Sequence, residues 1–361
     1  MRAAQANIHV EAITRNLARV RELAPGAKVL AIVKADGYGH GLERVTRYLS
    51  GADAFGVASI EDAERIRALG MNHRIVLLSG FDEQRDLDIV RELKLDCVLH
   101  DHAQLAMLAA EPSAASRDPI RFWLKFDTGM HRLGFAIDSA PEVLARVLAL
   151  PQTRAEITLM THFAQADEES EATSEQLELF DACNWPAGTG QSLANSAAML
   201  RFRDSRRDWV RPGGILYGLS TIAGKTGADL GFSPCMSLRS RLISVKTIPA
   251  GAKVGYGGSY VAASQMRIGI AAIGYGDGYP RHAKSGMPVL VGGKLASTVG
   301  RVSMDLLTID VSHLPFAKVG TEVLLWGPEL PVETVAELSG TISYELTCGV
   351  TRRVRFLETE A

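Results

Sequence analysis

The chain lacks the features that mark secreted, membrane-spanning and nucleic-acid-binding proteins. Its four cysteines are scattered through 361 residues without a CxxC pair, which argues against a disulfide scaffold and favours a reducing compartment. The formal net charge is only −2, so nothing electrostatic favours nucleic acid or an anionic membrane surface. No apolar run has the length of a membrane helix, and no early apolar segment is typical of a signal peptide. We therefore expect a cytoplasmic protein without nucleic-acid or membrane partners.

Clusters of metal-binding residues are also scarce. His100 and His102 flank Asp101, but no third or fourth ligand lies nearby at a suitable spacing. We predict no metal site.

The first two thirds of the chain alternate short apolar segments with amphipathic ones. This rhythm predicts parallel strands in right-handed units, in a number close to that of a (β/α)8 TIM-like barrel. We place the barrel at residues 8–229. The expected strands include 29–33, 54–58, 74–78, 97–99, 120–126 and 157–161.

From about residue 230 the pattern changes to closely spaced strand-like runs with few helices between them. Gly292 and Gly293 separate two apolar runs, which is typical of a two-residue hairpin. We expect a mostly β C-terminal domain over residues 230–361, and residues 1–7 are a candidate for one further strand of it.

The segment AIVKADGYGHG at residues 31–41 places Lys34 at the end of an apolar strand and before a glycine-rich turn. An ammonium desolvated in such a position has a lowered pKa and is a candidate Schiff-base nucleophile. The alternative is a lysine that reaches into solvent. The glycines favour the first interpretation because they permit close backbone approach to a ligand, and Tyr38 adds a hydroxyl beside the lysine.

Two further polar strand ends are expected on the same face, because the active site of such barrels lies at the C-terminal ends of the strands. One is Lys125 in KFDTGMHRLG (125–134), and the other is His162. Lys125 and Arg132 in one pocket require an anion between them. A bound carboxylate or a carbamate formed on Lys125 meets this need, whereas two solvated surface cations are the alternative.

Glycine-rich segments elsewhere offer weaker signals. Arg211-Pro212-Gly213-Gly214 and the nearby Asn195-Ser196 present donors suited to a phosphate, although Pro-Gly-Gly is also a common turn. Tyr256 and Tyr275 lie in tyrosine–glycine loops of the β domain. They are candidates for proton transfer or for simple aromatic packing.

Taken together, these motifs resemble those of the pyridoxal-phosphate-dependent alanine racemases. AIVKADGYGHG, KFDTGMHRLG, RPGG, VGYGGSY, GYGDGYPR and GRVSMD occur in the order seen in that family, from residue 31 to residue 305. A further segment, 343–348, is similar to the family's C-terminal stretch. The resemblance therefore covers nearly the whole chain.

The resemblance implies pyridoxal 5'-phosphate bound to Lys34. It also implies a homodimer with shared active sites, in which Tyr256 and Met304 come from the partner subunit. Lys34 and Tyr256 would be the catalytic bases, acting on D-alanine and L-alanine respectively. Lys125 would match a carbamylated lysine. The implied cofactor-binding residues are Lys34, Tyr38, His162, Asn195, Ser196, Arg211, Gly213 and Gly214, and the implied substrate-binding residues are Arg132, Met304 and Tyr275.

Two positions depart from the family pattern. Gly214 stands where many members have a branched apolar residue, and we expect this to loosen the phosphate loop. Arg352 stands where some members carry a tyrosine that contacts phosphate, and we transfer that role neither to Arg352 nor to Tyr344.

The expected function is the racemisation of alanine by two bases on the cofactor. The alternatives are a broader-specificity amino-acid racemase, a pyridoxal-phosphate amino-acid decarboxylase and a cofactor carrier without catalysis. Decarboxylases of this plan usually place an acid at the ring nitrogen and a cysteine opposite the lysine, where this chain offers Arg211 and Tyr256. A carrier has no need of a second base.

Overall fold

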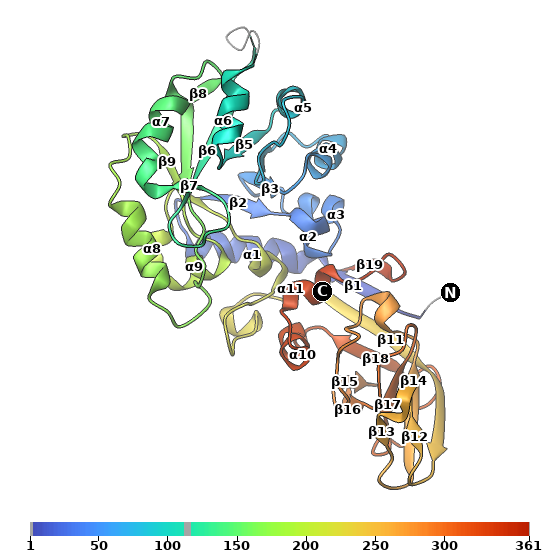
Figure 1. Ribbon diagram of the computed structural model, residues 1–361. Coiled ribbons are helices and arrows are strands. Elements are labelled where there is room, and N and C mark those ends of the chain that lie inside the picture. The colour runs from blue at the N-terminus through green and yellow to red at the C-terminus, as the bar shows by residue number, and fades with distance from the viewer. Residues whose placement is uncertain (1–2, 112–116, 361) are drawn as a thin grey trace.

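The computed structural model describes residues 3–111 and 117–360. They form a barrel and a mostly β domain, which lie side by side in Figure 1. Both parts agree with the predicted fold class.

The barrel consists of eight parallel strands, and the pairing of β5 with β6 closes it. Continuous apolar runs such as 29–33 form strands that are buried on both faces, as expected for a barrel wrapped by helices. Trp123 and Trp209 help to fill the interior. The strands are β2 (Lys28–Ile32), β3 (Ala54–Val57), β4 (Arg74–Leu77), β5 (Asp96–Leu99), β6 (Ile120–Asp127), β8 (Thr153–Met160), β9 (Gly190–Ser192) and β10 (Trp209–Val210), with the short β7 (Phe135–Ala136) beside β6.

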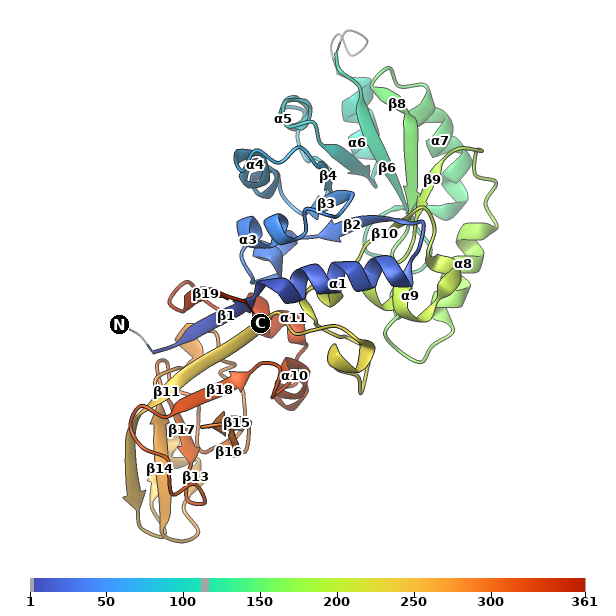
Figure 2. The ribbon, with the colours of Figure 1, turned by 180° about the vertical axis from the view of Figure 1, so that it is seen from behind.

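Helices cover the outside of the barrel (Figure 1). In Figure 2, α1 lies along the side of the barrel that faces the β domain. The helices are α1 (Val10–Leu23), α3 (Leu42–Tyr48), α4 (Ile60–Ala68), α5 (Asp86–Glu92), α6 (His102–Ala109), α7 (Ala140–Leu148), α8 (Ala172–Asp181) and α9 (Ser196–Arg201). Among the described residues, no helix is both long and apolar enough to cross a membrane.

The β domain is built on an eight-stranded sheet in the order β14-β17-β16-β15-β18-β11-β1-β19. Its N-terminal strand β1 (Gln5–His9) lies between the long β11 (Met236–Ile248) and the C-terminal β19 (Arg355–Thr359), so both chain ends belong to this sheet. The Gly292-Gly293 hairpin forms as predicted, between β15 and β16. The remaining elements are β12 (Lys253–Val254), β13 (Tyr260–Val261), β14 (Met266–Ala271), β15 (Pro288–Val291), β16 (Lys294–Thr298), β17 (Leu307–Asp310), β18 (Glu322–Trp326), α10 (Val332–Ser339) and α11 (Ser343–Cys348).

Candidate active site

Lys34 opens a left-handed turn at the mouth of the barrel. The prediction that it ends a strand is wrong by two residues, because β2 stops at Ile32 and the short α2 (Lys34–Tyr38) follows. Within α2, Ala35, Asp36 and Tyr38 have φ values of 53°, 53° and 54°. A left-handed conformation costs an L-residue about 1–2 kcal/mol. The surrounding structure must therefore hold this turn in place.

Aromatic rings support the turn from inside. The ring of Tyr38 stacks on that of Tyr217 at 5.0 Å, and Tyr217 stacks on His40 at 4.8 Å. The Tyr217 hydroxyl donates to the Ile32 carbonyl at 2.9 Å. Burial lowers the pKa of His40 to about 4, so its imidazole is neutral, and its Nδ1 lies 2.9 Å from the Tyr38 carbonyl. The neutral ring is suited to donate to that carbonyl.

The surroundings of the Lys34 amine favour its neutral, nucleophilic form. Burial and, next, the Arg132 guanidinium lower its pKa. A lowered pKa increases the fraction of neutral amine, which is the form that attacks a carbonyl to make a Schiff base. Cys348, at the end of α11, lies close enough to influence the same amine.

Lys125, on β6, is a second cation close enough to Lys34 to interact with its charge. Lys125 is only 7% exposed. Burial, followed by Arg211 and Arg132, lowers the pKa of Lys125 to about 8. The nearby Asp127 carboxylate is engaged by its own loop, where it accepts from the backbone N–H groups of Gly129 and His131. The structure thus brings these cations together as predicted, in surroundings that favour an anion.

Arg211 is 4% exposed and has no carboxylate partner among the residues that the structure describes. It donates to the carbonyls of Ser192, Thr161 and Leu193 at 2.6, 2.8 and 3.2 Å. Burial lowers the pKa of Arg211 to about 10, so the guanidinium keeps its charge at neutral pH. This position offers a buried, permanently charged donor rather than an acid.

Hydroxyls and glycines converge beside Tyr38. The Gly213 N–H donates to Ser196 Oγ at 2.9 Å. A Cβ atom on Gly213 would collide with the Tyr38 hydroxyl, so the backbone approaches that group as closely as only glycine permits. Asn195 lies in the same loop, but its Oδ1 caps α9 by accepting from the Ala198 N–H at 2.9 Å. The hydroxyls and backbone N–H groups fit a phosphate.

Tyr344 lies beside the hydroxyls of Tyr38 and Ser196 and the backbone of Gly213 and Gly214, which together are called the phosphate cradle. On sequence grounds we did not assign a phosphate contact to Tyr344. Its ring packs edge-on against Tyr38 at 5.2 Å. Its hydroxyl lies near the side chains of Ser196 and Thr221, which offset part of the rise that burial causes in its pKa. The same ring covers Gly214, where a Cβ atom would overlap it. Tyr344 thus occupies the space that a branched side chain at position 214 would fill, and residues 211–220 are buried. The expectation that Gly214 loosens the loop stays a prediction.

The candidate residues of the β domain form a separate group. Tyr275 and Gly276 donate their backbone N–H groups to the Ser303 and Met304 carbonyls at 3.0 and 2.9 Å. Tyr256 lies in the turn between β12 and β13 and is 69% exposed, and Met304 is 51% exposed. Figure 1 shows β12 and β13 at the end of the β domain remote from the barrel. Within one chain, Tyr256 is thus not brought to Lys34.

Known proteins share this combination of barrel and β domain. Residues 8–221 match the family described as alanine racemase, N-terminal domain, and residues 235–357 match alanine racemase, C-terminal domain. An alanine racemase from Shewanella woodyi is 47% identical over 351 residues, which are 97% of each chain.

Solved structures agree with these matches. The biosynthetic alanine racemase from Pseudomonas aeruginosa superposes with a TM-score of 0.96 at 42% identity and covers 100% of both chains. An alanine racemase from Bartonella henselae with covalently bound pyridoxal phosphate gives a TM-score of 0.89 at 26% identity, over 99% of each chain.

Proposed function

Because the chain belongs to the alanine racemase family, we propose that it interconverts L- and D-alanine with pyridoxal 5'-phosphate held at Lys34. The observation that carries this proposal is the Lys34 amine, whose pKa is lowered by burial and by Arg132. An amine so placed beside a phosphate cradle suits the aldehyde and the phosphate of this cofactor.

The cradle would hold the phosphate through the hydroxyls of Tyr38, Ser196 and Tyr344 and through the Gly213 and Gly214 backbone. Arg211 would face the pyridine nitrogen, with His162 close to the ring, and Asn195 would support the loop by capping α9. When bound, the cofactor withdraws electrons from the substrate Cα and acidifies its proton.

Inversion at Cα requires a base on each face, since a single base returns the proton to the side it came from. Lys34 supplies one face and acts on D-alanine. Tyr256 of the partner subunit supplies the other and acts on L-alanine. Arg132 and the Met304 backbone hold the substrate carboxylate, and Tyr275 lines the same region. Arg211 retains its proton and cannot pass it to the ring nitrogen, which suppresses side reactions such as transamination.

A homodimer with shared sites follows from this assignment. Its support is the exposure of Tyr256 and Met304 on the β domain and the position of β12 and β13 away from the barrel (Figure 1). We also propose that the barrel ends at residue 229 and the β domain begins at residue 230. We further propose a carbamate on Lys125, formed when its neutral amine adds to carbon dioxide and releases a proton. That carbamate would neutralise part of the positive charge around Arg132.

The cellular role is D-alanine supply in the cytoplasm. Its support is the likeness to a structure described as biosynthetic and four free cysteines, which suit a reducing compartment.

Chiral chromatography of L-alanine incubated with the protein and pyridoxal phosphate tests the function. We expect approach to an equal mixture of enantiomers, and loss of activity in both directions for Lys34→Ala. If no D-alanine forms although borohydride traps the cofactor on Lys34, the racemase proposal is wrong and decarboxylation or another amino acid becomes the better hypothesis. A substrate panel separates alanine from broader specificity.

A further inference from the structure

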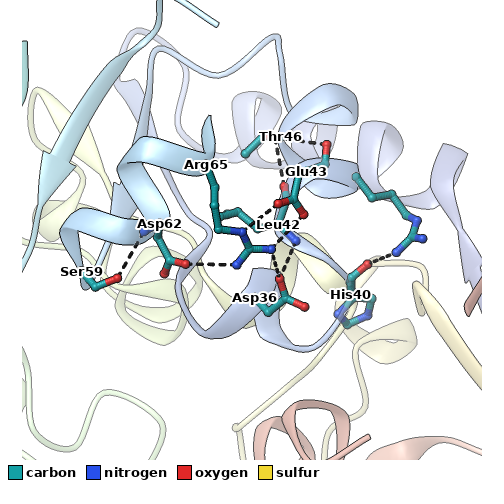
Figure 3. Close-up of polar contacts among 9 residues, drawn as sticks. Asp36, His40, Leu42, Glu43, Thr46, Ser59, Asp62 and Arg65 are labelled. Carbon is teal, nitrogen blue, oxygen red and sulfur yellow. Dashed lines mark hydrogen bonds and ion pairs between the residues drawn. The ribbon is translucent and has the colours of Figure 1, made fainter. Parts of the chain in front are cut away.

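The left-handed turn that carries Lys34 and Tyr38 is also held from outside, by a side chain of another helix. Figure 3 shows Arg65 of α4 between the carboxylates of Asp36, Glu43 and Asp62. Arg65 Nη2 donates to Asp36 Oδ1 at 2.8 Å, and Nε donates to Glu43 Oε1 at 2.7 Å. These contacts join the turn, α3 and α4, because each carboxylate comes from a different element.

Asp36 is the residue through which Arg65 and its carboxylate partners contact the turn. It lies two residues after Lys34 and two before Tyr38, in the left-handed region with φ 53°. The same Oδ1 atom that receives Arg65 also accepts from the Leu42 N–H at 3.0 Å, at the start of α3. The aspartate therefore fixes the distance from the turn to the next helix.

The charge balance makes Arg65 more important than an ordinary surface ion pair. One guanidinium faces three carboxylates, and it engages Glu43 through two bonds in the fork geometry that only arginine provides. Without it, Asp36, Glu43 and Asp62 repel one another, and the repulsion acts on Asp36, which links the turn to α3. Isolated exposed pairs contribute little, but networks with this geometry are the exception.

We infer that Arg65 is a positioning residue, which keeps residues 35–38 left-handed so that the Lys34 amine and the Tyr38 hydroxyl reach the cofactor together. This inference rests on the proposed function. Arg65 reaches the turn through its bond to Asp36, so its loss should affect how the cofactor is held.

The test compares cofactor binding and orientation in Arg65→Gln, Asp36→Asn and the double variant. The dissociation constant for pyridoxal phosphate comes from titration of the cofactor-free protein, and visible circular dichroism of the bound cofactor reports its orientation. We expect each single change to weaken binding about five- to tenfold and to reduce the visible signal. The double variant should be no weaker than the worse single one, because both changes cut the same link.

Arg207→Gln is the matched control, because Arg207 makes an exposed two-bond pair with Asp181 on α8, away from the turn. Arg65→Lys keeps the positive charge but cannot form the two parallel bonds to Glu43. Its affinity for pyridoxal phosphate should lie between those of wild type and Arg65→Gln. Equal cofactor affinity and equal visible signal in Arg65→Gln, Arg207→Gln and wild type would overturn the inference alone. Wild-type protein that takes up no cofactor would overturn the proposed function as well. If Arg65→Gln does not fold, Asp36→Asn carries the same expectation.

Discussion

Nη2 of Arg211 lies 3.4 Å from Nδ1 of His162, and the two side chains join the loops that follow β10 and β8. Burial and, next, the positive charge of Arg211 hold the pKa of His162 well below its ordinary value. The imidazole is therefore neutral and its Nδ1 is suited to accept from the guanidinium. The pair places a lasting positive charge deep in the barrel, and no carboxylate of residues 3–111 or 117–360 forms an ion pair with it.

Arg211→Met should destabilise the protein by about 3 kcal/mol, because buried carbonyls cost about 1–3 kcal/mol each when their donor is removed. The affected acceptors are the carbonyls of Ser192, Thr161 and Leu193. Urea denaturation of the cofactor-free protein measures the change. Arg207→Met, at an exposed pair, should cost less than about 1 kcal/mol. An equal loss of stability in the two variants would show that the buried Arg211 hydrogen bonds stabilise the protein no more than an exposed ion pair does.

Gly214→Ala should destabilise the protein by about 1–3 kcal/mol, the usual range for overpacking. The new Cβ atom overlaps the Tyr344 ring, so the ring must move away from Ser196. In Gly214→Ala/Tyr344→Leu the obstacle is smaller, and the combined cost should be less than the sum of the two single costs. Denaturation of the four proteins gives this coupling. Strict additivity would mean that the ring and the glycine do not depend on each other.

Local patterns were sufficient for six of the barrel strands but not for the short β9 and β10, nor for the turn that carries Lys34. The apolar run 29–33 predicts a buried strand, and Gly292-Gly293 predicts a hairpin; both are found. The glycines after Lys34 predict a turn, but no residue type in this segment predicts a left-handed conformation at Ala35 and Asp36. Its hand is stabilised by contacts with residues far along the chain, such as Tyr217.

The part that Tyr344 plays was missed for a similar reason. It lies 130 residues after Gly214 in the sequence, and only the packing of α11 against the lysine turn brings the two together. Tyr256 is a different case. Its motif was recognised by family resemblance, but in the proposed dimer its geometry toward Lys34 would depend on a second chain, which no pattern within one chain describes.

Lys125 should make stability depend on alkaline pH. Burial, with Arg211 and Arg132, lowers its pKa from 10.5 to about 8, which corresponds to about 3 kcal/mol. Between pH 8 and 10.5 the unfolded chain holds a proton that the folded protein lacks, so stability rises with pH across this window. Below pH 8 both states are protonated and the penalty is complete. Denaturation in carbon-dioxide-free buffer at several pH values should show this slope.

Lys125→Met is the control for that slope, since it removes the titrating group and should flatten the profile. Bicarbonate should stabilise the wild-type protein near pH 8, where carbon dioxide can trap the neutral amine, and should leave Lys125→Met unchanged. An identical response of the two proteins to bicarbonate would argue against a carbamate on Lys125.

Hybrid dimers test whether two chains build each site. Lys34→Ala and Tyr256→Phe should each be nearly inactive alone, because each removes one of the two bases. A purified hybrid of the two variants has one site with both changes and one with neither, so it should regain about half of wild-type activity, or about a quarter in an unpurified statistical mixture. The measurement is alanine racemisation by co-expressed chains carrying different affinity tags. If Lys34 and Tyr256 of the same chain met instead, every site in the hybrid would carry one change and no activity would return.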